Sequence, residues 1–328
     1  MLAKKQTVLF FLFIGICVSL VLISLMGQWD GGVFKDIGAD DKQKNSMQES
    51  YFKDAKYHLL KDDVPSFNLT SDELTINSTT EKIFFIKPRG FAFTSANERI
   101  DYEGDHGFFN QSAEVLVLEQ NTKVNMNVTS ADAKKLTYQM KEDRVHLENE
   151  VKTKTLHEGE GDWIYVNSDE AYFWPQAKRS RYVGNVEGEI DRKRVYEDSL
   201  SFSSYELLLN MVDLKADLNE NVVMKKRYLT ATSRRGEIFL ENYNKKLKYF
   251  ALYDDVKVVE KVMLDGKFIE RKAFSEKLEG LPSESKIILT GYPKVYQLND
   301  VIKGNKIVLR ENTEVVEVDD ANTKFKVE

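Results

Sequence analysis

The stretch Tyr182-Val183-Gly184-Asn185-Val186 is one copy of a short phrase that recurs along this chain and decides its fold. In each copy an apolar run starts at a valine that directly follows a polar residue, and the valines are Val151, Val186, Val222, Val256 and Val295. Successive valines are 35, 36, 34 and 39 residues apart. Such a period indicates a stacked array, in which one unit cannot bury its own apolar face and packs against the next.

A second motif, a small polar cluster, precedes the apolar runs. The clusters begin at Ser71, Ser95, Ser130, Ser168, Ser203, Thr232 and Ser283. Between the clusters apolar and polar residues alternate, as where Val124, Met126 and Val128 are separated by asparagines. A period of two predicts half-buried antiparallel strands.

Helical periodicity is rare in this sequence. Residues 46–60 are the candidate for one short helix, and residues 204–218 fit either a helix or two strands. The spacing of two among Leu207, Leu209 and Met211 favours a hairpin in the second case. We therefore expect an all-β fold, an elongated antiparallel β-jellyroll with twisted open sheets. Because residues 27–328 are many for one compact sandwich, we expect either one long stack or two modules, 55–190 and 191–328.

The amino terminus carries an uncharged apolar run over residues 8–26, preceded by Lys4 and Lys5. A helix of this length, at ~1.5 Å per residue, spans the ~30 Å hydrocarbon core of a bilayer. The lysines predict a cytoplasmic tip at residues 1–7 and export of the remainder, with residues 27–54 as a polar tether. A cleaved signal peptide is the alternative, but the run is long for one and its exit is a poor cleavage site.

Composition excludes several classes of protein. A net charge of −6 and a pI near 5.5 argue against nucleic-acid binding. The single cysteine, Cys17, lies in the apolar run, so neither an internal disulfide nor a cysteine metal site is possible. The sequence has no phosphate-binding glycine loop and no hydrolase or metalloprotease signature, and its four histidines are scattered. We therefore expect no enzyme activity, cofactor or metal.

Two stretches resemble a known family. Residues 130–136 and 144–151, Ser-Ala-Asp-Ala-Lys-Lys-Leu and Arg-Val-His-Leu-Glu-Asn-Glu-Val, resemble the repeat of lipopolysaccharide-export proteins, although Asn149 stands where that repeat usually has glycine. Residues 288–295 and 300–309 are similar to the closing repeat of the OstA-like periplasmic domain. The chain thus resembles the LptC/LptA (OstA-like) family. The predicted anchor makes it most like LptC, with an LptA-like carboxyl-terminal repeat region, but it is far longer than a typical LptC.

The resemblance implies a single-pass inner-membrane protein whose bulk is periplasmic. It further implies that the protein accepts lipopolysaccharide from an inner-membrane ABC transporter and passes it along a β-sheet bridge to the outer membrane. A structural or adhesive β-stack is the alternative, and an anchored carbohydrate-active enzyme is the less favoured one. Physical chemistry supports the lipid-transport function. Each CH₂ exposed to water costs ~0.8 kcal/mol, so acyl chains need a protein that shields them from water.

Two sets of residues are the candidates for this role. The lipid-contacting candidates, expected to face inward, are Phe84, Phe91, Phe93, Val115, Val117, Val124, Met126, Val186, Val222 and Val295. A terminal strand with an unpaired edge, Thr323, Lys324, Phe325, Lys326 and Val327, is the candidate for pairing with an LptA-type bridge protein or an outer-membrane receiver. Its two lysines leave open that the edge is instead protected against pairing.

Overall fold

The computed structural model describes residues 49–61, 64–156, 163–191, 199–241, 247–264, 266–310, 313 and 315–319. All of them lie in one compact unit, Met47–Glu328. The strands are β1 (Glu49–Lys61), β2 (Val64–Asn77), β3 (Lys82–Ile86), β4 (Arg89–Phe93), β5 (Arg99–Glu103), β6 (His106–Asn110), β7 (Val115–Met126), β8 (Thr129–Gln139), β9 (Arg144–Leu156), β10 (Trp163–Trp174), β11 (Arg179–Asp191), β12 (Leu200–Asn210), β13 (Lys215–Lys226), β14 (Leu229–Leu240), β15 (Leu247–Leu264), β16 (Lys267–Leu281), β17 (Lys286–Thr290), β18 (Lys294–Gln297), β19 (Asp300–Lys303), β20 (Lys306–Arg310) and β21 (Val316–Asp319). Two short 3-10 turns, η1 (Met140–Glu142) and η2 (Pro282–Glu284), are the helical elements of the described residues. The all-β prediction is confirmed.

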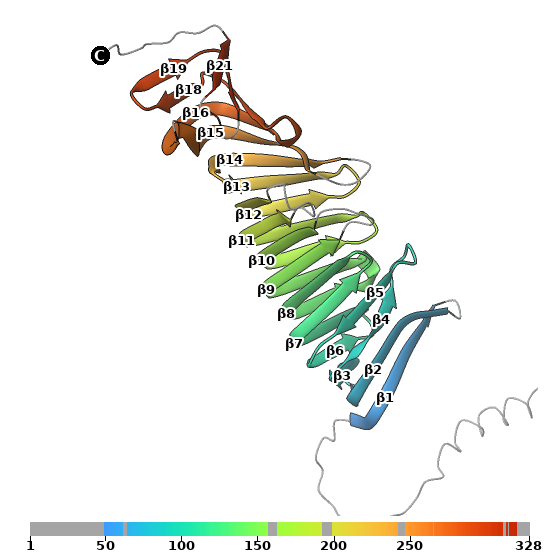
Figure 1. Ribbon diagram of the computed structural model, residues 1–328. Coiled ribbons are helices and arrows are strands. Elements are labelled where there is room, and N and C mark those ends of the chain that lie inside the picture. The colour runs from blue at the N-terminus through green and yellow to red at the C-terminus, as the bar shows by residue number, and fades with distance from the viewer. Residues whose placement is uncertain are drawn as a thin grey trace, which may run out of the picture. The chain divides into compact units, whose positions relative to one another are not determined.

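All of these strands belong to one twisted antiparallel sheet. From β7 to β16 each strand pairs with the next along the chain, and Figure 1 shows these strands following one another in sequence order. At the amino-terminal end, β7 pairs with β6 along its first half and with β5 along its second half. At the carboxyl-terminal end, β16 pairs in the same way with β18 and β17. Pairs of short strands therefore take the place of one long strand beside β7 and beside β16.

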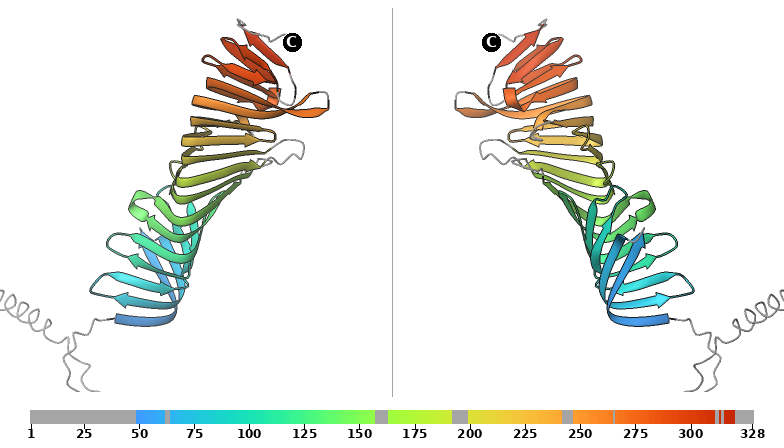
Figure 2. Two further views of the ribbon diagram at one scale, coloured as in Figure 1. Left: turned by 90° about the vertical axis from the view of Figure 1, so that its left-hand side faces the viewer. Right: turned by 90° about the vertical axis from the view of Figure 1, so that its right-hand side faces the viewer.

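The long strands bend near their middle, which the views of Figure 2 show as curvature. In β7, β9, β11, β13 and β15 two successive residues at the bend have φ between 45° and 76°: Gln120-Asn121, Asn149-Glu150, Gly184-Asn185, Glu220-Asn221 and Asp254-Asp255. The ladders shift register at these points, as between Glu119 and Thr122. Asn, Asp and Gly tolerate positive φ better than other residues, which explains the composition of the phrase. The valines at 151, 186, 222 and 256 are the first residues after the bends.

The bends divide the sheet into two walls. Wall A comprises residues 73–77, β3, β6, 115–119, 135–139, 144–148, 170–174, 179–183, 206–210, 215–219, 235–240, 247–253, 277–281, β17 and β20. Wall B comprises residues 67–70, β4, β5, 122–126, 129–133, 151–155, 163–168, 186–191, 200–204, 222–226, 229–233, 256–264, 267–275, β18 and β19. Their inner faces form one apolar core that runs from Phe67 to Leu309.

The polar clusters and the valine phrases, far apart in sequence, meet at the bends. Ser168, Ser204, Ser233 and Ser275 are buried, and each hydroxyl donates a hydrogen bond to the carbonyl two residues later, at 2.8 to 3.0 Å. On the strand opposite, Asn185 Nδ2 donates to Asp169 Oδ2 at 2.9 Å. The cluster at Ser283 differs: it lies in η2, directly before β17, whereas β16 bends at Ser275.

Several other predictions are tested by the strand boundaries. The helix proposed for residues 46–60 is wrong: β1 pairs with β2 over its whole length, and Ala55, Tyr57 and Leu59 alternate toward the core. Residues 49–54 accordingly belong to the sheet rather than to the predicted tether. The hairpin proposed within residues 204–218 is confirmed as β12 and β13.

The sheet also crosses the boundary suggested near residue 190, since Ile190 pairs with Leu200. The predicted tip, anchor and first part of the tether, residues 1–48, lie outside the described residues. Within the described part no helix has the length and apolarity that a bilayer crossing requires.

Candidate functional site

The apolar interior between the walls is the most extended feature of the unit. Wall A contributes Leu118, Leu147, Leu218 and Leu252, which are fully buried, and wall B contributes the valines that follow the bends, each about 1% exposed. The inner side chains touch one another across the core. The interior is therefore continuous, apolar and filled in this conformation. The sequence had predicted an open-sided trough, and the sheet does keep free edges, but its inner side chains fill the space between the walls.

The lipid-contacting candidates divide equally between the two faces. Val124, Met126, Val186, Val222 and Val295 are buried in the apolar core. Phe84, Phe91, Phe93, Val115 and Val117 lie on the outer face, so the prediction that they face inward is wrong. Ile83 and Phe85 are the inner neighbours of Phe84, and Ala92 takes the inner position between Phe91 and Phe93. In an all-apolar run the sequence carries no sign of which residues point inward.

The inner position could have been found from the bends. The valine that follows a bend points inward, so counting in twos from it assigns the face of every residue in that half-strand. This rule selects Val124 and Met126 in β7, two and four positions after the inner residue Thr122, whose hydroxyl donates to the carbonyl of Ala133 at 2.8 Å. It also places Asn125 outside, as predicted, where it is exposed.

The free ends of the walls are the sides that lie opposite the bends. Near the amino-terminal end of the sheet a polar contact joins them. The turn between β4 and β5, in wall B, meets the turn at η1, in wall A. The Ser95 amide donates to both oxygens of the Asp143 carboxylate, at 3.2 and 3.1 Å, and the Ser95 hydroxyl also donates to it. Asp143 is only 8% exposed, and the Tyr138 hydroxyl lies 3.5 Å from its Oδ1. Burial, and then the nearby Asp143 charge, raises the pKa of Tyr138 far above its usual range.

A second contact between the walls lies at the carboxyl-terminal end. Glu260 and Arg271 occupy inner positions in wall B and form an ion pair of 2.6 Å, with side chains 3% and 1% exposed. Arg271 also donates to the carbonyl of Arg310, which ends wall A, at 3.3 Å, and to that of Thr313 at 3.1 Å. All three guanidinium nitrogens thus donate hydrogen bonds inside an apolar setting, as a buried charge requires.

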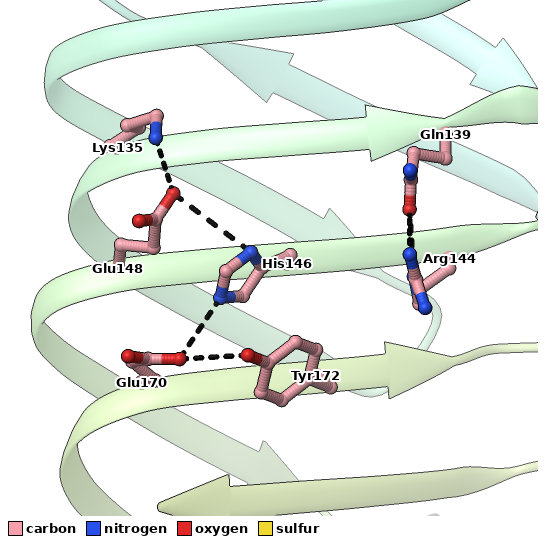
Figure 3. A network of polar contacts seen from close by, with 7 residues as sticks. All are labelled: Lys135, Gln139, Arg144, His146, Glu148, Glu170 and Tyr172. Carbon is pink, nitrogen blue, oxygen red and sulfur yellow. Dashed lines mark hydrogen bonds and ion pairs between the residues drawn. The ribbon is translucent and has the colours of Figure 1, made fainter.

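The outer face of wall A carries a ladder of polar residues just beyond the bends (Figure 3). Lys135 pairs with Glu148 at 2.5 Å, and His146 Nε2 lies 3.3 Å from Glu170. The Tyr172 hydroxyl donates to Glu170 at 2.7 Å, and its ring stacks on His146 with centroids 4.2 Å apart. The Tyr172 hydrogen bond lowers the pKa of Glu170. These residues lie open on the sheet surface, and the arrangement stabilises strand pairing rather than forming a catalytic cleft.

Two hollows of the surface are lined mainly by polar residues. One of about 360 Å³ lies on the outer face of wall B and is lined by Tyr165, Glu187, Ser203 and Lys225, among others. Another of about 450 Å³ is lined by Asp72, Lys87, Arg89 and Glu103, of which Lys87 and Asp72 pair at 3.1 Å. Neither belongs to the apolar interior. The described residues also contain no group of three His, Cys, Asp or Glu side chains placed to hold a metal ion.

The predicted partner strand, Thr323 to Val327, lies outside the described residues. The sheet nevertheless has three terminal strands within the described part: β1 pairs only with β2, β19 only with β18, and β21 only with β20. In β1 the side chains of Tyr51 and Phe52 are about half exposed. An edge with unpaired backbone groups is a template for another strand.

Comparison with known proteins relates this chain to a protein family and to solved structures. Residues 15–158 match the family model described as lipopolysaccharide-assembly, LptC-related. Among solved structures, one similar chain is LptH from Pseudomonas aeruginosa, the LptA-homologous periplasmic component of the conserved lipopolysaccharide transport device; it is 15% identical, with a TM-score of 0.33, and the match covers 37% of this chain and 82% of LptH. No curated protein matches the sequence.

Proposed function

We propose that the chain is a membrane-anchored lipid carrier of the periplasm, because residues 15–158 match the LptC-related family model, which implies a role in lipopolysaccharide transport. It accepts lipopolysaccharide from an inner-membrane ABC transporter and passes it toward the outer membrane. The acyl chains lie between walls A and B, while sugars and phosphates remain in water at the free ends of the walls. Transport of this kind needs no catalytic residues and no cofactor.

The observation that supports the proposal most strongly is the long apolar band of both inner walls, which the Glu260–Arg271 pair interrupts in wall B. A carrier must hold several acyl chains at once, and burial of each CH₂ contributes ~0.8 kcal/mol. A largely apolar wall also offers many similar positions, so that a lipid can move from one to the next without a deep trap. The inner valines, spaced by about one repeat, supply such a surface.

Because the interior is filled, binding of a lipid requires that the walls separate. The two walls belong to one sheet joined at the bends, so separation is a hinge motion about the bends that leaves every ladder paired. The contacts that oppose it are apolar side chains and the polar contacts at the free ends. Ser95 with Asp143 is one of these, and we propose that it parts when lipid passes.

Partners of the lipopolysaccharide transport machinery are expected at the sheet edges. We propose that one edge continues into the sheet of an LptA-type bridge protein or an outer-membrane receiver, through β1 or through residues 323–327. Backbone hydrogen bonds would then join two sheets, and their apolar bands would align.

Photocrosslinking tests the lipid path. A photoreactive residue at Val124, Val186, Val222 or Val295 should label lipopolysaccharide in cells. Matched positions on the outer face of the same strands, Asn125 beside Val124 and Glu187 beside Val186, should not. Labelling from the outer positions alone contradicts the proposal.

A structural β-stack is the second candidate, and the filled interior is the observation that favours it. The two candidates differ in two results. A structural stack gives no lipid adduct from any of the inner positions, and its depletion does not cause lipopolysaccharide to accumulate at the inner membrane.

A further inference from the structure

One outer face of the sheet differs in charge from the rest of the molecule. We call it the lysine face: the outward residues of wall B in β15, β16, β18 and β19, namely Lys257, Val259, Lys261, Met263, Phe268, Glu270, Lys272, Phe274, Lys294, Tyr296, Val301 and Lys303. It holds five lysines and one glutamate, in a chain whose net charge is −6. The strands that carry it follow β14 in Figure 1.

Lysines and large apolar side chains alternate on this face in both directions. Across the strands, Phe274 is flanked by Lys257 and Lys294, and Lys272 is flanked by Val259 and Tyr296. The apolar members are well exposed: Phe268 is 54% exposed, Met263 42% and Tyr296 41%. The ring of Tyr228 lies 5.4 Å from that of Phe268, which extends the apolar surface to the turn before β14.

The charges of the lysine face are not satisfied within the described part of the chain. Lys272 pairs with Glu270 at 2.8 Å, whereas Lys257, Lys261, Lys294 and Lys303 form no ion pair with another described residue. Wall A differs, because many of its outer basic side chains form ion pairs, as Lys135 does with Glu148 and Lys277 with Glu279. The acids near the lysine face are occupied elsewhere: Glu260 points inward to Arg271, and Asp254 and Asp255 pair with Arg235 and Arg234 at the bend.

We propose that the lysine face docks on the surface of an anionic phospholipid bilayer. Lysine and aromatic side chains side by side are the composition of protein surfaces at the headgroup region, where the rings reach the acyl boundary and the ammonium groups meet phosphates. An acidic protein partner would pair the lysines but would leave the apolar side chains between them without a matching surface. The inference concerns an outer face and goes beyond the transport path between the walls.

Vesicle binding tests it on the full chain. The protein is held in nanodiscs of phosphatidylcholine, so that residues 8–26 have lipid of their own, and is then mixed with vesicles that contain phosphatidylglycerol. We expect the nanodisc-bound protein to float with these vesicles and not with pure phosphatidylcholine vesicles. Replacing Lys257, Lys261, Lys294 and Lys303 by Gln should weaken binding at least tenfold, because each basic residue near an anionic surface strengthens binding about fivefold.

The matched control uses two exposed lysines of wall A in the same part of the chain, Lys248→Gln and Lys306→Gln, which should leave flotation unchanged. Replacing Phe268 and Phe274 by Ser keeps the charge and should also weaken binding to the anionic vesicles. Equal loss in the control and the lysine-face variants, or flotation that is indifferent to phosphatidylglycerol, overturns the proposal. Far-ultraviolet circular dichroism of each variant verifies that the sheet is retained.

Discussion

Ser95 and Asp143, 48 residues apart in sequence, hydrogen-bond across the free ends of the two walls. The bends fix one side of the sheet, and this contact closes the opposite side at the amino-terminal end. The Asp143 residue is 8% exposed, and its carboxylate accepts several hydrogen bonds. These bonds replace the water that a charged group loses on burial, so they hold the carboxylate firmly.

Asp143→Ala should loosen this end of the molecule. The Ser95 amide loses both acceptors, so hydrogen exchange of residues 94–98 should accelerate, and the free energy of unfolding should fall by about 1.5 to 3 kcal/mol, the range for hydrogen bonds to a charged group. Hydrogen exchange with mass spectrometry and urea denaturation measure the two effects. Ser112→Ala, which removes an exposed hydrogen bond to Asn110, is the control and should change neither. Unaltered exchange at residues 94–98 would show that the contact does not hold the walls.

Arg271→Met should be strongly destabilising, because it leaves the Glu260 carboxylate inside the core without the guanidinium. The expected loss is about 3 to 5 kcal/mol. The double substitution Glu260→Met with Arg271→Met should recover most of it, since two apolar side chains suit the surrounding valines. Lys277→Met breaks an ion pair with Glu279 whose members are about one-third exposed, and should cost less than about 1 kcal/mol. Urea denaturation measures the free energy of unfolding of each variant. A double variant no more stable than Arg271→Met would contradict the interpretation that the loss comes from the unpaired Glu260 carboxylate.

Gly188→Ala should destabilise the sheet by about 1 to 3 kcal/mol, the usual cost of overpacking. An added Cβ would lie 2.2 Å from Cζ of Phe202, whose buried ring packs on the glycine from the neighbouring strand. Phe202→Leu in the same chain should relieve part of the loss. Gly280 and Phe250 have the same relationship, so Gly280→Ala should behave alike. Thermal denaturation of the variants tests this, and an unchanged midpoint for both glycine variants would refute it.

Tyr172→Phe should raise the pKa of Glu170. The phenol hydrogen bond holds the pKa of this carboxyl below its ordinary value. A lowered pKa adds stability above the ordinary pKa, and this contribution disappears as the pH falls through the folded-state pKa. Carboxyl chemical shifts in a pH titration report the change directly. The effect on unfolding should stay below about 1 kcal/mol, because Glu170 is 46% exposed. Tyr165→Phe, remote from Glu170, should leave its titration unaltered.

The sequence predicted the strands better than their faces. Alternation placed β12 and β13 correctly, and the recurring valines marked the start of the half-strands after the bends. The prediction of a helix at residues 46–60 failed, because pairing with β2 outweighs the local secondary-structure preference of these residues. The prediction of the inner face also failed at Phe84 and Phe91, since an apolar residue beside another apolar residue carries no signal of direction.

The amino-acid sequence by itself determined that the chain is a repeating antiparallel β-structure, because the period of two and the repeat of about 35 residues are properties of the order of residues. Only the tertiary structure decided that the interior is filled, that Arg271 and Glu260 sit inside it, and that Ser95 meets Asp143. These contacts join residues from different strands, and their positions follow from the bends and the register, which no local pattern specifies.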